Sequence, residues 1–367
     1  MLNRCKKLLL PELTIHYHGS GNHILALDGL RGLAILLVIL FHTFHFMFGW
    51  CGVDLFFVLS GFLITGTLIE SKNNPHYFSN FWIKRILRIF PVYYLVLAII
   101  IIPKVYFQVN TVTYTSWTYW FYLQNWQYIK NGVFPDGRDT LNHFWSLAIE
   151  EQFYFIFPFV IRYTRNKLMP FLLVAFVFMG IAFRYYYFTH NNIGYYVGTF
   201  SRMDSLTMGA LLAYFIRYNR VFLEKWTLAL FYISLVYIAS VLILTQNMHF
   251  SNPYFAGIGL TFFALFFSGL LIFSISDFKN NFFKPLLILK PLIFVGKISY
   301  GLYIYHWILY VFIKPPLERF IFSGFTHSIA SKIATSAIII SVSIVLSYFS
   351  FFYFERKVLK LKNRWIR

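Results

Sequence analysis

Apolar runs of about 20 residues recur along the chain and alternate with short polar stretches. A helix that crosses a bilayer needs roughly 20 consecutive apolar residues, so each run has the length of one membrane span. We therefore predict an all-α, polytopic membrane protein with ten spans in a single transmembrane domain over residues 1–367. The predicted spans are 27–48, 51–70, 89–108, 144–162, 168–188, 201–217, 226–245, 256–275, 292–313 and 328–352.

The composition agrees with this class, because 59% of the residues are hydrophobic and 12% are charged, whereas soluble proteins carry about 25% charged residues. The net charge of +19 would indicate nucleic acid in a soluble protein. Here the basic residues lie in short loops between apolar runs, so we expect no nucleic-acid partner. Cys5 and Cys51 match no metal or redox pattern, and we expect both reduced and no metal site. We expect no cleavable signal, since the first apolar run is too long and begins only at residue 27.

Basic residues divide unevenly between the two sides of the predicted spans. One side holds those near 4–7, 72–88, 162–167, 217–225, 279–297 and 356–367. The other side holds Lys104, Lys130, Arg138, Arg184, Arg202, Lys314, Arg319 and Lys332. Cytoplasmic loops carry the excess of Lys and Arg, so we predict that both termini are cytoplasmic.

The stretch LDGLRGLAILLVILFH, residues 27–42, carries Arg31 near one end and His42 at the other. Their spacing puts both side chains on nearly the same helical face, roughly 16 Å apart along the axis. Both groups are costly in lipid, so we expect them to face a protein interior or a watery cavity. One interpretation is a site with an anion-binding arginine and a proton-transferring histidine. The other is a snorkelling arginine and a histidine satisfied by a neighbour.

The second span opens GVDLFFVLSGFLIT, residues 52–65, and places Asp54 at a depth comparable to His42. A carboxylate there could orient the imidazole and raise its basicity, or it could be a hydrated interfacial group. Gly52, Gly61 and Gly66 are expected where helices pack closely.

Two arginines in IKRILRIFPVYY, residues 83–94, lie at the predicted cytoplasmic mouth of the third span. Arg85 and Arg88 are three residues apart and so share one helical face. Together they can form a bidentate phosphate clamp, or they can be ordinary cytoplasmic charge.

A carboxylate pair interrupts the apolar stretch HFWSLAIEEQFYFIFP, residues 143–158. Such groups inside a membrane are functional candidates, with polar contact between helices as the alternative. His143, Ser146 and Glu150 fall on one face, and Glu151 points about a quarter-turn away.

Two further stretches carry polar groups. In FSRMDSLTMGALLA, residues 200–213, we favour a structural ion pair of Arg202 with Asp204 or a helix cap. In GKISYGLYIYHW, residues 296–307, Ser299 and His306 share a face with Tyr303 between them. His306 is either a hydrogen-bonded core histidine or part of a site. The outer connection 109–143 is rich in Tyr and Trp, which predicts an interfacial belt or a wall for a sugar-like acceptor.

Taken in order, these stretches resemble the integral-membrane acyltransferase family 3, whose members O-acylate carbohydrates and other acceptors. The resemblance covers nearly the whole chain, and it rests on the ordered set of motifs. It implies ten helices with cytoplasmic termini and an acyl-CoA donor, usually acetyl-CoA. It also implies that Arg31, His42, Arg85 and Arg88 are required. Some relatives carry an outer esterase-like domain, and we expect any second transfer step here to need a separate protein.

These observations give a mechanistic hypothesis. His42 is the expected base, with His45 as a substitute, and Arg31, Asp54 and Glu150 join it as catalytic candidates. Arg85 and Arg88 would bind the CoA phosphates, and Arg31 the phosphates or the thioester region. The acceptor, a cell-envelope carbohydrate such as lipopolysaccharide or a glycolipid, would meet the substrate-binding candidates, which are His143, Glu151 and His306. Direct transfer and a covalent relay both stay open.

Two other classes compete with the enzyme. A transporter or flippase for an acylated lipid or sugar would show broken helices and inverted repeats. A membrane scaffold would not explain an arginine and a histidine in line within one span. Within the enzyme class, a lipid or peptide acceptor is the alternative to a glycan. We expect a multi-pass protein of a bacterial inner membrane.

Overall fold

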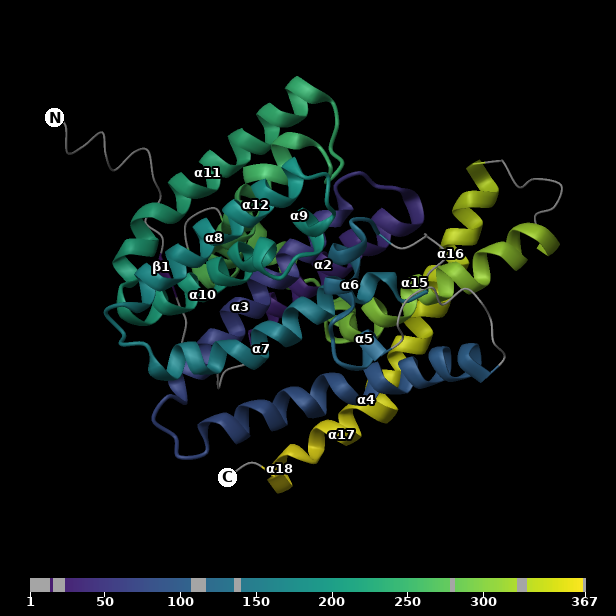
Figure 1. Ribbon diagram of the computed structural model, residues 1–367, viewed down its shortest axis with the longest axis horizontal. Coiled ribbons are helices and arrows are strands. Elements are labelled where there is room, and N and C mark those ends of the chain that lie inside the picture. The colour runs from purple at the N-terminus through teal and green to yellow at the C-terminus, as the bar shows by residue number, and fades with distance from the viewer. Residues whose placement is uncertain are drawn as a thin grey trace.

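The computed structural model describes residues 14–15, 24–106, 117–134, 140–277, 281–321 and 329–365. Within these residues the chain is almost entirely helical (Figure 1). The exception is a short antiparallel pairing of β1 (Thr14–Ile15) with β2 (Ser276–Asp277). The predicted all-α class is confirmed. Cys5 lies outside the described residues.

Eight helices in the described part of the chain are long and apolar enough to cross a membrane. They are α2 (Leu25–Phe44), α3 (Gly52–Glu70), α4 (Tyr77–Tyr106), α7 (Trp145–Tyr163), α8 (Met169–Thr189), α11 (Arg220–Thr245), α16 (Ile329–Phe349) and α12 (Leu260–Ile275), which the helical turn before it extends to a span of 21 residues, Phe255–Ile275. A ninth span is the pair α14 (Lys290–Lys297) and α15 (Ser299–Pro316), which bends by 74° at Ile298. The polytopic class is therefore confirmed, and the side on which the termini lie stays a prediction.

The predicted span 201–217 corresponds to α10 (Met203–Tyr218), which has 16 residues and is short for a crossing helix. Its side chains are mostly buried, so α10 lies inside the bundle rather than against lipid. Every predicted span thus coincides with a helix, while eight helices, or nine with the bent pair, have the length of a span.

Short elements connect these helices. The α-helical ones are α5 (Trp117–Trp120), α6 (Gln124–Asn131), α9 (Gly194–Val197), α13 (Phe283–Leu287), α17 (Arg356–Lys360) and α18 (Lys362–Trp365). The 3-10 turns are η1 (Gly49–Cys51), η2 (Asn142–Phe144) and η3 (Phe200–Arg202), and the π-helical turns are η4 (Phe255–Gly259), η5 (Leu317–Ile321) and η6 (Ser350–Glu355).

The centre of the bundle is formed by α2, α3, α10 and α12. The apolar windows of α3 and α12 are 72% and 78% buried, whereas those of α11 and α16 are 28% and 17% buried. Helices α11 and α16 therefore present their apolar side chains to lipid, as the outer helices of a membrane protein do.

Glycines let the central helices approach each other closely. A Cβ at Gly61 on α3 would overlap the carbonyl oxygen of Leu206 on α10, and one at Gly52 would overlap that of Ala34 on α2. A Cβ at Gly66 would lie 2.7 Å from the Arg217 guanidinium. The predicted close packing of helices is confirmed at Gly52 and Gly61, whereas the neighbour of Gly66 is the end of a flexible side chain.

Candidate active site

A cavity of about 110 Å³ lies between α2, α3, α4, α7 and α15. We call it the cationic cavity, because Arg31, Arg85 and Arg88 line it together with a single carboxylate, that of Glu150. Arg31 comes from α2, the other two arginines from α4, and Glu150 from α7.

The three arginines differ in how far their charge is neutralised. Nη1 of Arg31 donates to Oδ1 of Asp28 at 2.9 Å, one turn earlier on α2. Arg85 lies over the rings of Phe81 and Tyr154, each 5.8 Å from its guanidinium carbon. Among the residues the structure describes, neither Arg85 nor Arg88 forms an ion pair, and the buried Nε of Arg85 has no hydrogen-bond partner. The cavity therefore holds cationic charge that an anion can satisfy.

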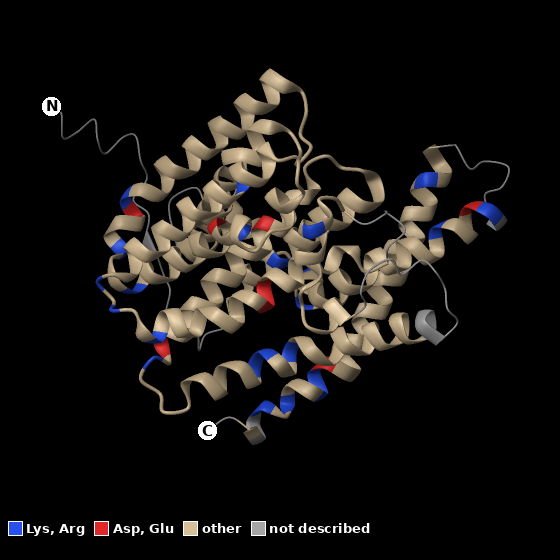
Figure 2. Cartoon of the chain, viewed as in Figure 1, with Lys and Arg blue, Asp and Glu red and all other residues tan. Residues whose placement is uncertain are grey.

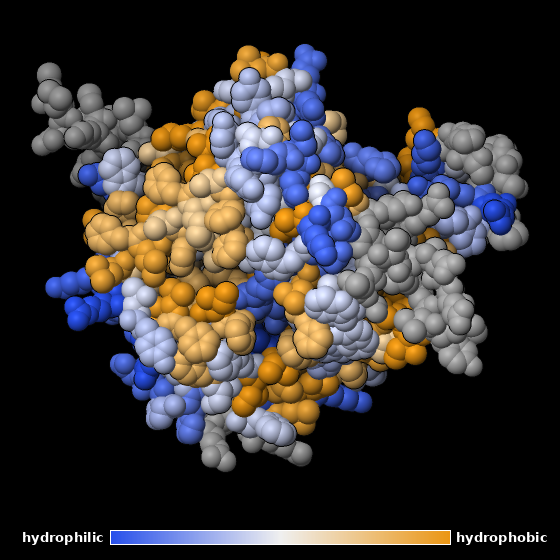
Figure 3. Space-filling model, viewed as in Figure 1, coloured by the Kyte–Doolittle hydropathy of each residue, from blue (hydrophilic) through white to orange (hydrophobic). Residues whose placement is uncertain are grey.

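The two adjacent glutamates of α7 face different cavities, as their quarter-turn offset predicts. Glu150 lines the cationic cavity beside Ser60 and Tyr154. Glu151 lines a larger groove of about 660 Å³ between α4, α6 and α7, which also contains Arg85. The groove is otherwise almost wholly apolar, and Figure 3 shows a recessed hydrophilic patch beside α7 on a largely hydrophobic face.

A third cavity, of about 310 Å³, contains His42 and His143. We call it the histidine cavity. Its walls are largely aromatic, and they are made by Phe41, Trp50, Phe134, Trp145, Tyr196, Phe250, Tyr303 and Trp307. Such a lining suits a ligand with apolar faces and a few polar groups.

Hydrogen bonds fix the protons of two histidines at the edge of this cavity. Nδ1 of His306 is 2.9 Å from the carbonyl oxygen of Leu302, which can only accept, so Nδ1 carries the proton. In the neutral ring Nε2 of His306 is then an acceptor, and it lies 3.0 Å from Nδ1 of His42. His42 must donate from Nδ1, which leaves the lone pair on its Nε2. No described residue bonds to that Nε2, so it is available to take a proton.

His143 has a complementary arrangement. Its Nε2 is 3.2 Å from the carbonyl oxygen of Ile304 and must donate to it. The buried Nδ1 has no partner in the described part of the chain and carries a lone pair. His143 can therefore accept a hydrogen bond from a ligand hydroxyl in the histidine cavity.

The cationic cavity and the histidine cavity share a wall. Val53 of α3 and Tyr303 of α15 line both. The Tyr303 hydroxyl donates to the carbonyl oxygen of His143 at 2.8 Å and lies 2.5 Å from Oγ of Ser146. Arg31 and His42 thus face two adjoining cavities inside the protein, with one tyrosine and one valine between them.

Asp54 does not lie against His42, contrary to the sequence prediction. It is fully buried, and its Oδ1 accepts from Nη2 of Arg202 at 2.6 Å and from Oγ of Ser205 at 3.0 Å. Asp54 pairs with Arg202 of turn η3 rather than with the imidazole, because a carboxylate buried inside a membrane protein needs a cationic partner. His306 holds the orienting position that we expected for Asp54.

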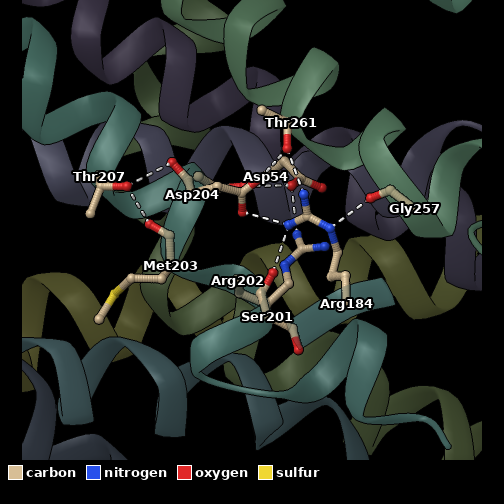
Figure 4. Close-up of polar contacts among 10 residues, drawn as sticks. Asp54, Arg184, Ser201, Arg202, Met203, Asp204, Thr207, Gly257 and Thr261 are labelled. Atoms are coloured by element: carbon tan, nitrogen blue, oxygen red, sulfur yellow. Dashed lines mark hydrogen bonds and ion pairs between the residues drawn. The ribbon is translucent and has the colours of Figure 1, made fainter. Parts of the chain in front are cut away.

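A second buried ion pair lies beside the first. Nη1 of Arg184 is 2.8 Å from Oδ1 of Asp204, whose Oδ2 accepts from Thr261 at 2.6 Å. The predicted pair of Arg202 with Asp204 is therefore wrong, since each pairs with another helix. Figure 4 shows the two guanidinium groups side by side between the carboxylates, where they join α3, α8, α10 and α12. We call Asp54, Arg184, Arg202 and Asp204 the ion-pair network.

Two other expectations change. His45 ends α2 with φ of 53° and lines a separate surface hollow, so it cannot replace His42 as the base. The connection 109–143 contributes Phe134 to the histidine cavity, but most of the aromatic wall comes from other segments. Residues 107–116 and 135–139 of that connection lie outside the described residues.

No group of three His, Cys, Asp or Glu residues in the described ranges is arranged to hold a metal ion.

A family model described as an acyltransferase domain matches residues 24–351 of the chain. The chain belongs to this acyltransferase family. It is 29% identical over 317 residues to an O-acetyltransferase OatA of Staphylococcus aureus, a match that covers 80% of this chain and 52% of that protein. It is 30% identical over 324 residues to a peptidoglycan O-acetyltransferase OatA of Listeria monocytogenes, covering 82% and 51%.

The chain thus spans about half the length of the curated acyltransferases it matches. No solved structure matches this acyltransferase. The resemblance that the sequence motifs indicated is confirmed by the family match.

The sequence did not indicate most of the residues that form the cavity walls. Trp50 of η1, Tyr196 of α9 and Phe250 from the connection before η4 reach the histidine cavity from three places far apart in the chain. No local pattern distinguishes them from the many other aromatic residues. Tyr303 was placed between Ser299 and His306 by helical spacing, but spacing alone did not show that it separates two cavities.

Proposed function

We propose that the protein is a membrane-bound O-acyltransferase. In this proposal it transfers an acetyl group from acetyl-CoA, bound from the predicted cytoplasmic side, to a hydroxyl of a cell-wall carbohydrate. The observation that carries the proposal is the wall shared by the cationic cavity and the histidine cavity. An anion-binding site adjoining a base is what acyl transfer from an anionic thioester to an alcohol requires.

The cationic cavity fits the donor in its chemistry. Arg85 and Arg88 lack ion pairs among the described residues, and guanidinium groups bind phosphate oxygens in a bidentate manner. CoA supplies an activated thioester when it is bound. Arg31 is held by Asp28 deeper in the cavity wall, where it would position the donor rather than compete for its phosphates.

The histidine cavity supplies the proton transfer. Nε2 of His42 takes the proton of the acceptor hydroxyl while the hydroxyl oxygen attacks the thioester carbonyl carbon. The carbon–sulfur bond then breaks, and the leaving thiolate takes that proton from His42. His143 would accept a hydrogen bond from the acceptor, and the aromatic walls would contact its apolar faces. This direct transfer needs no acyl-enzyme intermediate.

The acceptor class rests on the relatives. The Listeria protein is named a peptidoglycan O-acetyltransferase, which favours a cell-wall carbohydrate over lipopolysaccharide among the expected acceptors. The apolar helices and the bacterial relatives support a multi-pass protein of the bacterial cytoplasmic membrane.

Substitution of the proposed base tests this function. Membranes containing His42→Ala should transfer radiolabelled acetyl from acetyl-CoA to peptidoglycan fragments roughly 10²–10⁴-fold more slowly than the wild type. Binding of acetyl-CoA should not change. The matched control is His45→Asn on the same helix, which tolerates the left-handed conformation at that position and should keep full turnover. Normal turnover by His42→Ala would exclude His42 from the reaction.

His306 is a positioning residue in this scheme, and its role depends on one acceptor atom. His306→Phe removes the acceptor for Nδ1 of His42 and should lower kcat roughly 10–100-fold with KM for acetyl-CoA unchanged. His306→Gln can place a carbonyl oxygen near the same point and should recover most of kcat. Equal losses in both variants would show that His306 only fills space.

A further inference from the structure

The cationic cavity is too small to contain the whole donor of the proposed function. Its volume is about 110 Å³, whereas sites that enclose a drug-sized ligand measure roughly 300–1,000 Å³. Coenzyme A is larger than such a ligand. The cavity can therefore accept only part of the pantetheine arm, and the nucleotide end must lie on the protein surface beside Arg85 and Arg88.

The surface beside those arginines is built by the other end of the chain. Helices α17 and α18 pack along α4, and Figure 1 shows α17 running beside the first half of α4. The π-helical turn η6 leads into α17 and ends at the buried Glu355. That carboxylate is held by Ser350 at 2.9 Å and lies within electrostatic range of Arg88.

This surface gathers cations from both helices. Lys84 and Arg88 on α4 are exposed, as are Arg356, Lys357 and Lys360 on α17 and Lys362 on α18. Lys362 is close enough to Lys84 for their charges to interact. Figure 2 shows basic residues on the neighbouring stretches of α4 and α17. We call this set the α4–α17 basic surface.

Packing like charges together costs free energy unless an anion lies between them. The general excess of basic residues on cytoplasmic loops explains that cations occur here. It does not explain why the last helices return to lie along the helix that carries Arg85 and Arg88. A polyanion that extends out of the cationic cavity would contact both rows of cations.

We propose that the α4–α17 basic surface binds the 3′-phosphoadenosine diphosphate end of the donor, with Lys357 and Lys360 as phosphate contacts. This assignment rests on the proposed use of acyl-CoA, and it adds a subsite on the C-terminal helix. The shared chemistry is phosphate recognition. An anionic lipid headgroup is the competing source of phosphate, so the experiment must separate the two.

The test measures equilibrium binding of radiolabelled coenzyme A to the full chain in phosphatidylcholine vesicles, with no acceptor present. The variant Lys357→Gln/Lys360→Gln should bind roughly tenfold more weakly than the wild type. The matched control, Arg165→Gln/Lys167→Gln, removes two exposed cations from the α7–α8 connection on the same predicted side and should bind normally. With dephospho-coenzyme A, which lacks the 3′-phosphate, the difference between variant and wild type should shrink.

Three results would overturn the assignment. The α17 variant could bind coenzyme A as the wild type does, or both double variants could lose affinity equally. The loss could also appear only in vesicles that contain phosphatidylglycerol, which would assign the surface to lipid headgroups. Absence of acetyl transfer by a wild type that binds coenzyme A through α17 would count against the proposed function and not against this subsite.

Discussion

The ion-pair network and the cationic cavity both contain arginines inside the bundle, and they differ in how the charge is balanced. In the network, Arg184 and Arg202 are paired with Asp204 and Asp54, and all four side chains are fully buried. In the cavity, three arginines share a lining with one glutamate, and two of them have no ion pair among the described residues. Inside a membrane protein, arginines that are paired with carboxylates connect helices, whereas arginines without an ion pair leave positive charge that a bound anion can neutralise.

The ion-pair network also contacts a wall of the histidine cavity. The guanidinium of Arg202 lies over the rings of Phe57 and Tyr196, at 5.4 and 5.2 Å from their centroids. Tyr196 is part of the wall of the histidine cavity. The structural charges and the functional charges are therefore neighbours, and only the partners of each arginine tell them apart.

The largest effect should come from breaking the network. Asp54→Asn leaves Arg202 buried without a counter-charge and should destabilise the fold by about 3–5 kcal/mol. We expect a loss of folded protein in detergent, measured by thermal unfolding and size-exclusion chromatography. Replacing both partners, as Asp54→Leu/Arg202→Met, should recover part of that loss. A stable Asp54→Asn protein that lacks turnover would instead make Asp54 a catalytic residue.

Neutralising one arginine of the cationic cavity should have a smaller effect, which appears in KM for acetyl-CoA rather than in stability. Arg88→Gln removes a charge that forms no ion pair among the described residues, so the unfolding temperature should change little. A charge-assisted hydrogen bond contributes about 1.5–3 kcal/mol, so KM for acetyl-CoA should rise roughly 10–100-fold. The measurement is initial-rate kinetics in vesicles alongside thermal unfolding. A destabilised Arg88→Gln protein would mean that the two regions do not differ as described.

The smallest effect should be that of salt concentration on the binding of coenzyme A. Arg88 lines the cationic cavity and is exposed to solvent, so added salt should weaken coenzyme A binding several-fold between 0.05 and 0.5 M. The ion-pair network is fully buried, and its contribution to unfolding should be nearly insensitive over that range. Salt-independent binding would indicate that the donor is held by contacts other than charge.

Much of this fold could be predicted from the sequence because membrane spans have a required length and polarity. Helical spacing correctly predicted that Ser146 and Glu150 face the same cavity, whereas Arg31 and His42 line two adjoining cavities. The partners of buried charges could not be predicted. The sequence offered His42 as the partner of Asp54 and Asp204 as the partner of Arg202, but the packing of the helices gives Asp54 to Arg202 and Asp204 to Arg184.

The hydrogen-bond partner that orients His42 also could not be predicted from the sequence. Its partner His306 lies 264 residues away along the chain, and nothing local to either residue indicates the contact. The sequence offered the carboxylate of Asp54 as the partner. The structure instead uses a second neutral imidazole held by the Leu302 carbonyl.

The tyrosine and valine between the two cavities have a consequence for the cell. A protein that hands an acyl group across a membrane risks leaving an open water path, which would let protons run down their gradient and would waste thioester by hydrolysis. Among the described residues, the linings of the two cavities share only Val53 and the hydrogen-bonded Tyr303. In the proposed transfer the acetyl group has to pass Tyr303, which would move during turnover and would keep the membrane closed to water between turnovers.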